Sequence, residues 1–193
     1  MKSISNIICS VIILIFSNNL YSQSTWIQQH PFLPVSIPVF IKFLNPNTGF
    51  ILTENYVMLQ TTNGGIDWKS KLLPRGAKGI CYLGNIIAIP GNNGNNPGST
   101  IYKSTDCGLS WSLITLPYVI KNLSMLDNSN WYASTSEDSF LKSSDGGNTW
   151  NLIPLGLNMS SYRIIFTDVN NGYLCGQGIS GGTYSALIAK TSN

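Results

Sequence analysis

The chain has 193 residues, of which only 10% are charged, and its formal net charge is +3. Disordered tails combine low hydrophobicity with high net charge, so this composition excludes one, and its scarcity of charge suits a secreted β-protein. The Lys residues form no basic cluster interleaved with aromatic residues, which argues against a nucleic-acid partner.

The first 22 residues have the pattern of a signal peptide. Lys2 gives a positive start, residues 7–16 are nearly all apolar, and Leu20-Tyr21-Ser22 ends in a small residue. We predict cleavage after Ser22. The apolar run is shorter than the about 20 residues of a spanning helix. We therefore expect no membrane span after cleavage, and a secreted, periplasmic or cell-surface location.

Residues 23–193 are predicted to form short strands in groups of four, because β-branched and aromatic runs alternate with turn residues. A lone strand is expected at 26–29, opened by Trp26. The expected groups are 38–43, 49–53, 56–60 and 68–72; then 79–83, 85–89, 99–103 and 111–116; then 123–125, 131–135, 139–142 and 150–153; and finally 162–166, 172–177 and 184–190. Two Asn- and Gly-rich stretches, 90–98 and 178–183, are predicted to be long surface loops.

One pattern precedes the fourth strand of the first three groups: Ser or Thr, any residue, Asp or Asn, any residue, Gly, any two residues, then Trp. The copies are Thr61, Asn63, Gly65 and Trp68; Ser104, Asp106, Gly108 and Trp111; and Ser143, Asp145, Gly147 and Trp150. A further copy begins at Thr191-Ser192-Asn193. We expect the Asp or Asn to accept backbone N–H bonds a residue or two ahead, the Gly to supply positive φ, and the Trp to be buried over the loop.

The copies recur at a nearly constant period. Trp68 and Trp111 lie 43 residues apart, and Trp111 and Trp150 lie 39 apart. Residues 43–50 also match residues 166–173 position for position, 123 residues downstream. Four strands in each repeat of about 40 to 50 residues are typical of propeller blades.

The recurring motif resembles the Asp-box of the bacterial neuraminidase repeat, which is found in β-propellers. The whole pattern of the mature chain also resembles the photosystem II stability and assembly factor family. This resemblance implies an all-β, seven-bladed propeller that acts as a protein-binding scaffold in photosystem assembly. We expect about four blades here, at roughly 30–73, 77–116, 120–154 and 160–193, as a fragment of such a propeller. The alternative is a four-bladed ring in which the Trp26 strand completes the last blade.

The cysteines and the single histidine predict no metal or cofactor site. After cleavage Cys81, Cys107 and Cys175 remain, without a short Cys-x-x-Cys spacing, and the one histidine is His30. An odd count leaves at least one free thiol. We interpret the three as small apolar residues, packed on strands or in a loop. Cys107 stands where the other two motif copies have Gly.

The chain is predicted not to be an enzyme. Sialidases share the motif, but their clamp on the substrate carboxylate needs three arginines, and this chain has only Arg75 and Arg163. Carboxylates between the second and third strands could converge on a cleft, as in a glycosidase. The candidate binding face comprises Glu54, Asn93, Asn95, Glu137, Asp138 and Tyr184. A protein partner is the first hypothesis for this face, and glycan binding or hydrolysis is the second.

Overall fold

The structure is a computed structural model that describes residues 36–73, 75, 77, 79–92, 98–180 and 183–192. Within these ranges the chain forms strands and no helix, and consecutive strands pair antiparallel into four sheets. Sheet one contains β1 (Pro38–Phe43), β2 (Gly49–Thr53), β3 (Val57–Thr61) and β4 (Lys69–Leu72). Sheet two contains β5 (Cys81–Leu83), β6 (Ile86–Asn92), β7 (Ser99–Ser104) and β8 (Ser112–Leu116). Sheet three contains β9 (Ile120–Met125), β10 (Trp131–Thr135), β11 (Ser139–Ser143) and β12 (Asn151–Pro154), and sheet four contains β13 (Met159–Phe166), β14 (Asn171–Ser180) and β15 (Thr183–Ser192).

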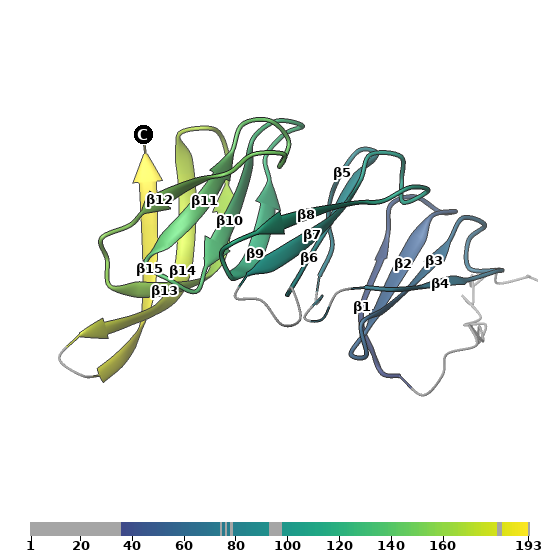
Figure 1. The fold of residues 1–193 in the computed structure, drawn as a ribbon, viewed down its shortest axis with the longest axis horizontal. Coiled ribbons are helices and arrows are strands. Elements are labelled where there is room, and N and C mark those ends of the chain that lie inside the picture. Colours follow the sequence, from purple (N-terminus) through teal and green to yellow (C-terminus); the bar gives the residue numbers. More distant parts are fainter. Residues whose placement is uncertain are drawn as a thin grey trace, which may run out of the picture.

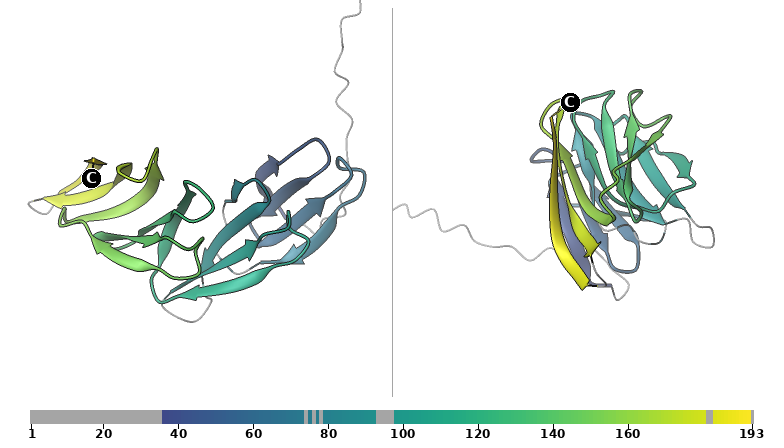
Figure 2. Two further views of the ribbon diagram at one scale, coloured as in Figure 1. Left: turned by 90° about the horizontal axis from the view of Figure 1, so that it is seen from above. Right: turned by 90° about the vertical axis from the view of Figure 1, so that its left-hand side faces the viewer.

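The four sheets follow one another along an open arc, with sheets one and four at opposite ends of the molecule (Figures 1 and 2). The strands predicted from residue 38 onward are confirmed in order and position, and the strand predicted at 26–29 lies outside the described residues. The described residues do not form the closed four-bladed ring that we considered as an alternative. Trp26, which that ring requires, and the predicted signal peptide lie outside the described residues.

The cores lie between successive sheets, which pack face to face. Every residue of β10 is buried, because this strand is central in its sheet and has a sheet on either side, whereas β12 at the rim is mostly exposed. Three clusters join sheet one to two, two to three, and three to four. Their members include Phe50, Leu52 and Ile87; Ile101, Trp131 and Leu141; and Tyr132, Ile164 and Leu174.

The motif loops are organised by a buried hydroxyl that the sequence analysis left unexplained. The Ser143 Oγ accepts a bond from the Gly147 N–H at 2.8 Å and donates one to the Asp145 Oδ1 at 2.8 Å. The Asp145 carboxylate in turn accepts bonds from Thr149, through its N–H at 2.9 Å and its hydroxyl at 2.6 Å. The cap thus reaches three and four residues ahead, where we had expected one or two. Gly147 has a φ of +84°, as the turn requires.

The motif tryptophans are only half-buried, where we had expected buried indoles. The indole N–H of Trp150 donates to the Gly147 carbonyl at 2.9 Å, and that of Trp111 donates to the Gly108 carbonyl at 2.9 Å. This bond ties the rim of each of these two loops to the start of its fourth strand. The exposure follows from position, because the fourth strands lie at the rim of the arc.

The first turn of each outer sheet confirms the second internal correspondence. The Oδ1 atoms of Asn45 and Asp168 each accept two backbone N–H bonds, two and three residues ahead. Gly49 and Gly172 then lie under the rings of Phe43 and Phe166. A Cβ at either glycine would come within 2.6 Å of that ring.

A side chain from one sheet also bonds to the motif loop of the next. Gln60 donates from its Nε2 to the Cys107 carbonyl at 3.2 Å, and Lys103 donates from its Nζ to the Gly146 carbonyl at 2.8 Å. Both residues immediately precede the motif hydroxyl, and we call this place the latch position. Lys142 and Lys190 occupy it in sheets three and four.

The two predicted surface loops are shorter than expected. Pro90, Gly91 and Asn92 belong to β6 and pair with Ile101, Thr100 and Ser99 of β7. Likewise, β14 extends through Ser180 and β15 begins at Thr183, so that most of the predicted loop 178–183 is a long hairpin. The expectation was wrong because glycine content suggested a loop where a neighbouring strand offers a partner.

Candidate binding surfaces

The predicted carboxylates lie on two different sheets. Glu54 is exposed in the turn between β2 and β3, and Glu137 is exposed in the turn between β10 and β11. Sheet two stands between them (Figure 1). None of the pockets described below is lined by Glu54 together with Glu137 or Asp138. These pockets therefore do not bring together the carboxylate pair that we predicted for a glycosidase.

Asp138 has a structural role that the sequence did not reveal. Its carboxylate accepts backbone N–H bonds from Leu157 at 3.2 Å, Asn158 at 2.9 Å and Met159 at 3.3 Å. These residues lie on the connection from sheet three to sheet four. Asp138 therefore fixes one sheet to the next.

A side pocket brings two of the six candidate residues together. It has a volume of about 420 Å³ and is lined by Ser136, Asp138, Asn158, Met159, Ser160, Gln177 and Tyr184. The Tyr184 ring is 68% exposed at its rim. The candidates Asn93 and Asn95 lie outside the described residues, and Glu54 and Glu137 do not line this pocket.

An inner hollow is formed where the first strands of the four sheets approach one another. It has a volume of about 540 Å³, and Phe40 of β1, Cys81 of β5, Lys121 of β9 and Arg163 of β13 all line it. Asn92 contributes from the end of β6. The described lining residues include two cations and no carboxylate, so the hollow suits a ligand with an acidic group.

Sequence reasoning did not single out Lys121, and it considered Arg163 only as a sialidase residue. Each is an isolated cation on an ordinary strand, and only the curvature of the arc brings β9 and β13 to one hollow. The position of both on a first strand was the one available signal.

Cys81 of this hollow is not a nucleophile. Its Sγ donates to the Leu123 carbonyl, and burial raises the pKa of the thiol to about 12 despite the lowering effect of Arg163. A thiol held protonated is unreactive. All three described cysteines are free, and Cys175 is exposed, so our expectation that it packs as an apolar residue was wrong.

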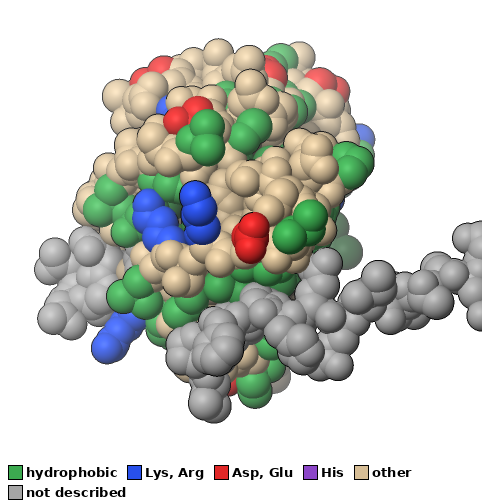
Figure 3. All heavy atoms as spheres, turned by 90° about the vertical axis from the view of Figure 1, so that its right-hand side faces the viewer, with side chains coloured by type: hydrophobic (Ala, Val, Ile, Leu, Met, Phe, Trp, Pro, Cys, Tyr) green, Lys and Arg blue, Asp and Glu red, His purple; other side chains and the backbone are tan. Residues whose placement is uncertain are grey.

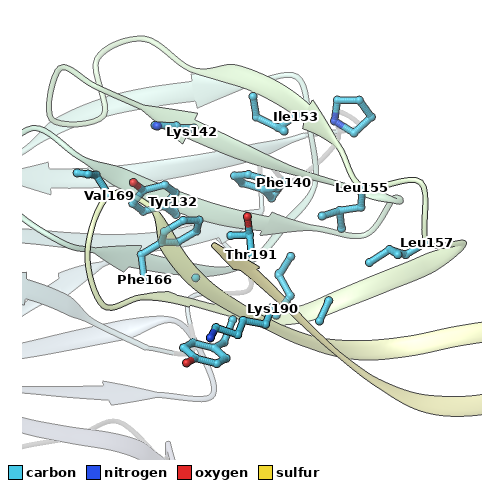
Figure 4. Close-up of a pocket in the computed structure, with 15 residues that line it drawn as sticks. Tyr132, Phe140, Lys142, Ile153, Leu155, Leu157, Phe166, Val169, Lys190 and Thr191 are labelled. Carbon is cyan, nitrogen blue, oxygen red and sulfur yellow. The ribbon is translucent and has the colours of Figure 1, made fainter. Parts of the chain in front are cut away.

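An outer groove of about 500 Å³ runs between sheets three and four. Tyr132 and Phe166 stack at its base with ring centroids 3.6 Å apart (Figure 4). Ile153 of β12 lines one side and Ala189 of β15 the other. Lys142 reaches into it, with its ammonium 5.8 Å from the centre of the Tyr132 ring. The groove is mostly apolar.

The described part of the chain contains no group of three or more His, Cys, Asp and Glu that could hold a metal ion. It also contains no helix long and apolar enough to cross a membrane.

Comparison with known proteins supports the predicted resemblance. No protein-family model matches the chain. The chain is 28% identical to the photosystem II assembly lipoprotein Ycf48 of Synechococcus sp. strain CC9902, over 58% of this chain and 35% of the relative. It therefore spans about a third of the length of this curated relative.

Solved structures show the same fold. YCF48 bound to D1 peptide superposes with a TM-score of 0.55 and 22% identity, over 81% of this chain and 54% of that one. A GH74 enzyme from Niastella koreensis gives 0.56 and 19%, over 79% and 28%. The GH74 xyloglucanase from Xanthomonas campestris gives 0.51 and 12%, over 76% and 27%. The β-propeller prediction and the resemblance to photosystem II assembly factors are thus confirmed.

Proposed function

We propose that this chain, a β-propeller similar in sequence to Ycf48, is a secreted, non-enzymatic scaffold. It binds an extended protein segment in its inner hollow. The observation that carries this proposal is that Lys121 and Arg163 both line the hollow, whose described lining residues include no carboxylate. The similar YCF48 structure is a complex with a peptide, which supports a protein ligand.

The chemistry of the hollow favours a segment that carries a carboxylate. The guanidinium of Arg163 can hold a carboxylate through two parallel bonds, and the Lys121 ammonium adds a second charge. The Asn92 and Asn122 amides, which also line the hollow, can bond to the main chain of the segment. Such charge contacts predict binding that weakens as salt rises.

Selection from a library of random linear peptides tests this proposal. We expect enriched peptides to contain Asp or Glu, and their affinity to fall at least tenfold in the Arg163→Ala variant. The matched control is Lys69→Ala, which removes an exposed cation from β4 outside the hollow. Equal loss in both variants, or no enrichment at all, would refute the inner hollow as the site.

Glycan binding or hydrolysis is the second candidate, favoured by the structural likeness to two GH74 enzymes. The separation of Glu54 from Glu137 argues against hydrolysis. Incubation with xyloglucan and with a fluorogenic sialoside is expected to release no product. Release that is abolished by Glu137→Gln would establish the enzyme instead.

The secreted location is part of the same proposal and rests on the first 22 residues. Mass spectrometry of the protein purified from a bacterial host is expected to find an amino terminus at Gln23. An intact Met1 in the exported protein would contradict it.

A further inference from the structure

Sheet four differs from the other three because β15 is its edge strand and no described fourth strand covers it. The outer groove lies beside this edge. In the other sheets the fourth strand pairs with the third in a constant register. There the latch residue pairs with the residue after the motif Trp: Gln60 with Lys69, Lys103 with Ser112, and Lys142 with Asn151.

We propose that residues 24–29 of a second copy of this chain bind along β15 as its fourth strand. The sequence Ser24-Thr25-Trp26 ends as the motif copy Asn148-Thr149-Trp150 does, with a hydroxyl residue before the Trp. The constant register then pairs Ile27 with Lys190 and Gln28 with Ala189. Main-chain bonds along the edge give such strand addition its affinity, and side-chain pockets give it specificity.

The register also directs the Trp26 indole into the outer groove. Trp150 packs against the core between sheets two and three, so the motif Trp of a sheet faces the preceding sheet. Trp26 would accordingly face sheet three, over Ala189 and beside Ile153, which both line the groove. The Tyr132 hydroxyl, buried and without a hydrogen-bond partner in the described structure, and the Lys142 ammonium are donors available to the incoming strand.

The geometry favours a second copy over the segment's own sheet four. From Gln29 to Ser36 the chain can span at most about 25 Å. Sheets pack about 10 Å apart, so sheets one and four are separated by roughly 30 Å, and the fourth-strand place lies three strand widths further outward. The segment of the same copy is therefore too short to reach.

A second copy placed in this way would cover two exposed apolar faces. Ile37, just before β1, and Val39 and Ile41 of β1 are 62%, 48% and 63% exposed. Figure 3 looks onto this end of the molecule, where hydrophobic side chains are exposed beside Lys or Arg side chains. The outer face of sheet four exposes Ile165 at 56% and Ile188 at 80%. Faces this apolar on a monomer mark an interaction site.

The connection that results resembles those within the chain. Between a fourth strand and the next first strand the structure has three to eight residues, and residues 30–37 would supply eight. We therefore expect a dimer with two exchanged strands.

The oligomeric state of the full chain, purified from an exporting host, tests the proposal. Light scattering is expected to give a dimer whose dissociation constant rises at least tenfold in Trp26→Ala. The matched control, Ile66→Ala, removes an apolar side chain that is 80% exposed on a motif loop and should leave the dimer unchanged. An excess of synthetic peptide 23–35 should dissociate the dimer, and the same peptide with Trp26→Ala should not.

Disulfide trapping tests the register and identifies the donor. In a background with Cys107→Ser and Cys175→Ser, the pair Gln28→Cys and Ala189→Cys is expected to yield a covalent dimer. The shifted pair Gln28→Cys and Leu187→Cys should yield little. A monomer at all concentrations, an oligomer insensitive to Trp26→Ala and to the peptide, or a disulfide closed within one copy would each overturn strand exchange between copies.

Discussion

The tightest contact of the third motif loop makes Gly147→Ala a quantitative test of how that loop is packed. Gly147 has a φ of +84°, and a Cβ there would lie 2.5 Å from Cε3 of Trp131, whose side chain is fully buried. Left-handed backbone costs an alanine about 1–2 kcal/mol. Overpacking a filled core costs about 1–3 kcal/mol more. We therefore expect urea unfolding to show a loss of about 2–5 kcal/mol.

The matched control is Gly156→Ala, because Gly156 has a similar φ of +69° but no atom within 4 Å of its added Cβ. It should lose only the backbone contribution of about 1–2 kcal/mol. The difference between the two variants then isolates the contact with Trp131. If both lose the same free energy to within about 0.5 kcal/mol, the loop does not pack on Trp131 as described here.

Three further predictions concern the same loops. Cys107→Gly should raise the melting temperature and increase the free energy of unfolding by up to about 1 kcal/mol, because Cys107 has a φ of +57°, which glycine adopts without strain. A lower melting temperature would contradict this prediction. Bonds from the Thr149 hydroxyl and backbone hold the pKa of Asp145 at about 2, below its ordinary 3.8, so its carboxylate stabilises the fold above about pH 4 and this contribution is lost as pH falls toward 2. Melts of Asp145→Asn should therefore show a smaller loss of stability between pH 5 and pH 2.5 than the parent, and an equal loss would count against the cap. Trp150→Ala should lose about 2–4 kcal/mol of unfolding free energy, since the indole is half-buried. Asp138→Ala should lose less, about 1–3 kcal/mol, because three backbone N–H groups lose their acceptor. Equal melting temperatures would show that the bonds of Asp138 contribute as much to stability as the Trp150 indole.

The fold could be predicted from the sequence because the residues that form the turns and end the strands recur in each repeat. The residues Thr61, Ser104 and Ser143 mark the end of each third strand, and Trp68, Trp111 and Trp150 mark the start of the fourth to within one residue. Asn45 and Asp168 mark the first turns in the same way. These signals act over a few residues, so the sequence contains them in full.

The candidate site was less predictable because it depends on how the sheets curve. Lys121 and Arg163 are 42 positions apart in the sequence and line one hollow only because β9 and β13 lie side by side. The role of Asp138 was missed for a similar reason, since its partners lie about 20 residues downstream on the next linker. Pro90 suggested the end of a strand, but β6 continues through Pro90 because β7 pairs with it there.

The hydrogen bonds from the latch position affect how the sheets separate from one another. Gln60 joins sheet one to the loop of sheet two, and Lys103 joins sheet two to the loop of sheet three, so local fluctuations are coupled between nearest neighbours. In such a linear array, the end units have one neighbour each and fray first. Amide hydrogen exchange of an isolated copy should accordingly be fastest in the terminal sheets and slowest in β10. Protection would spread outward from the middle of the arc, as in a repeat array with open ends.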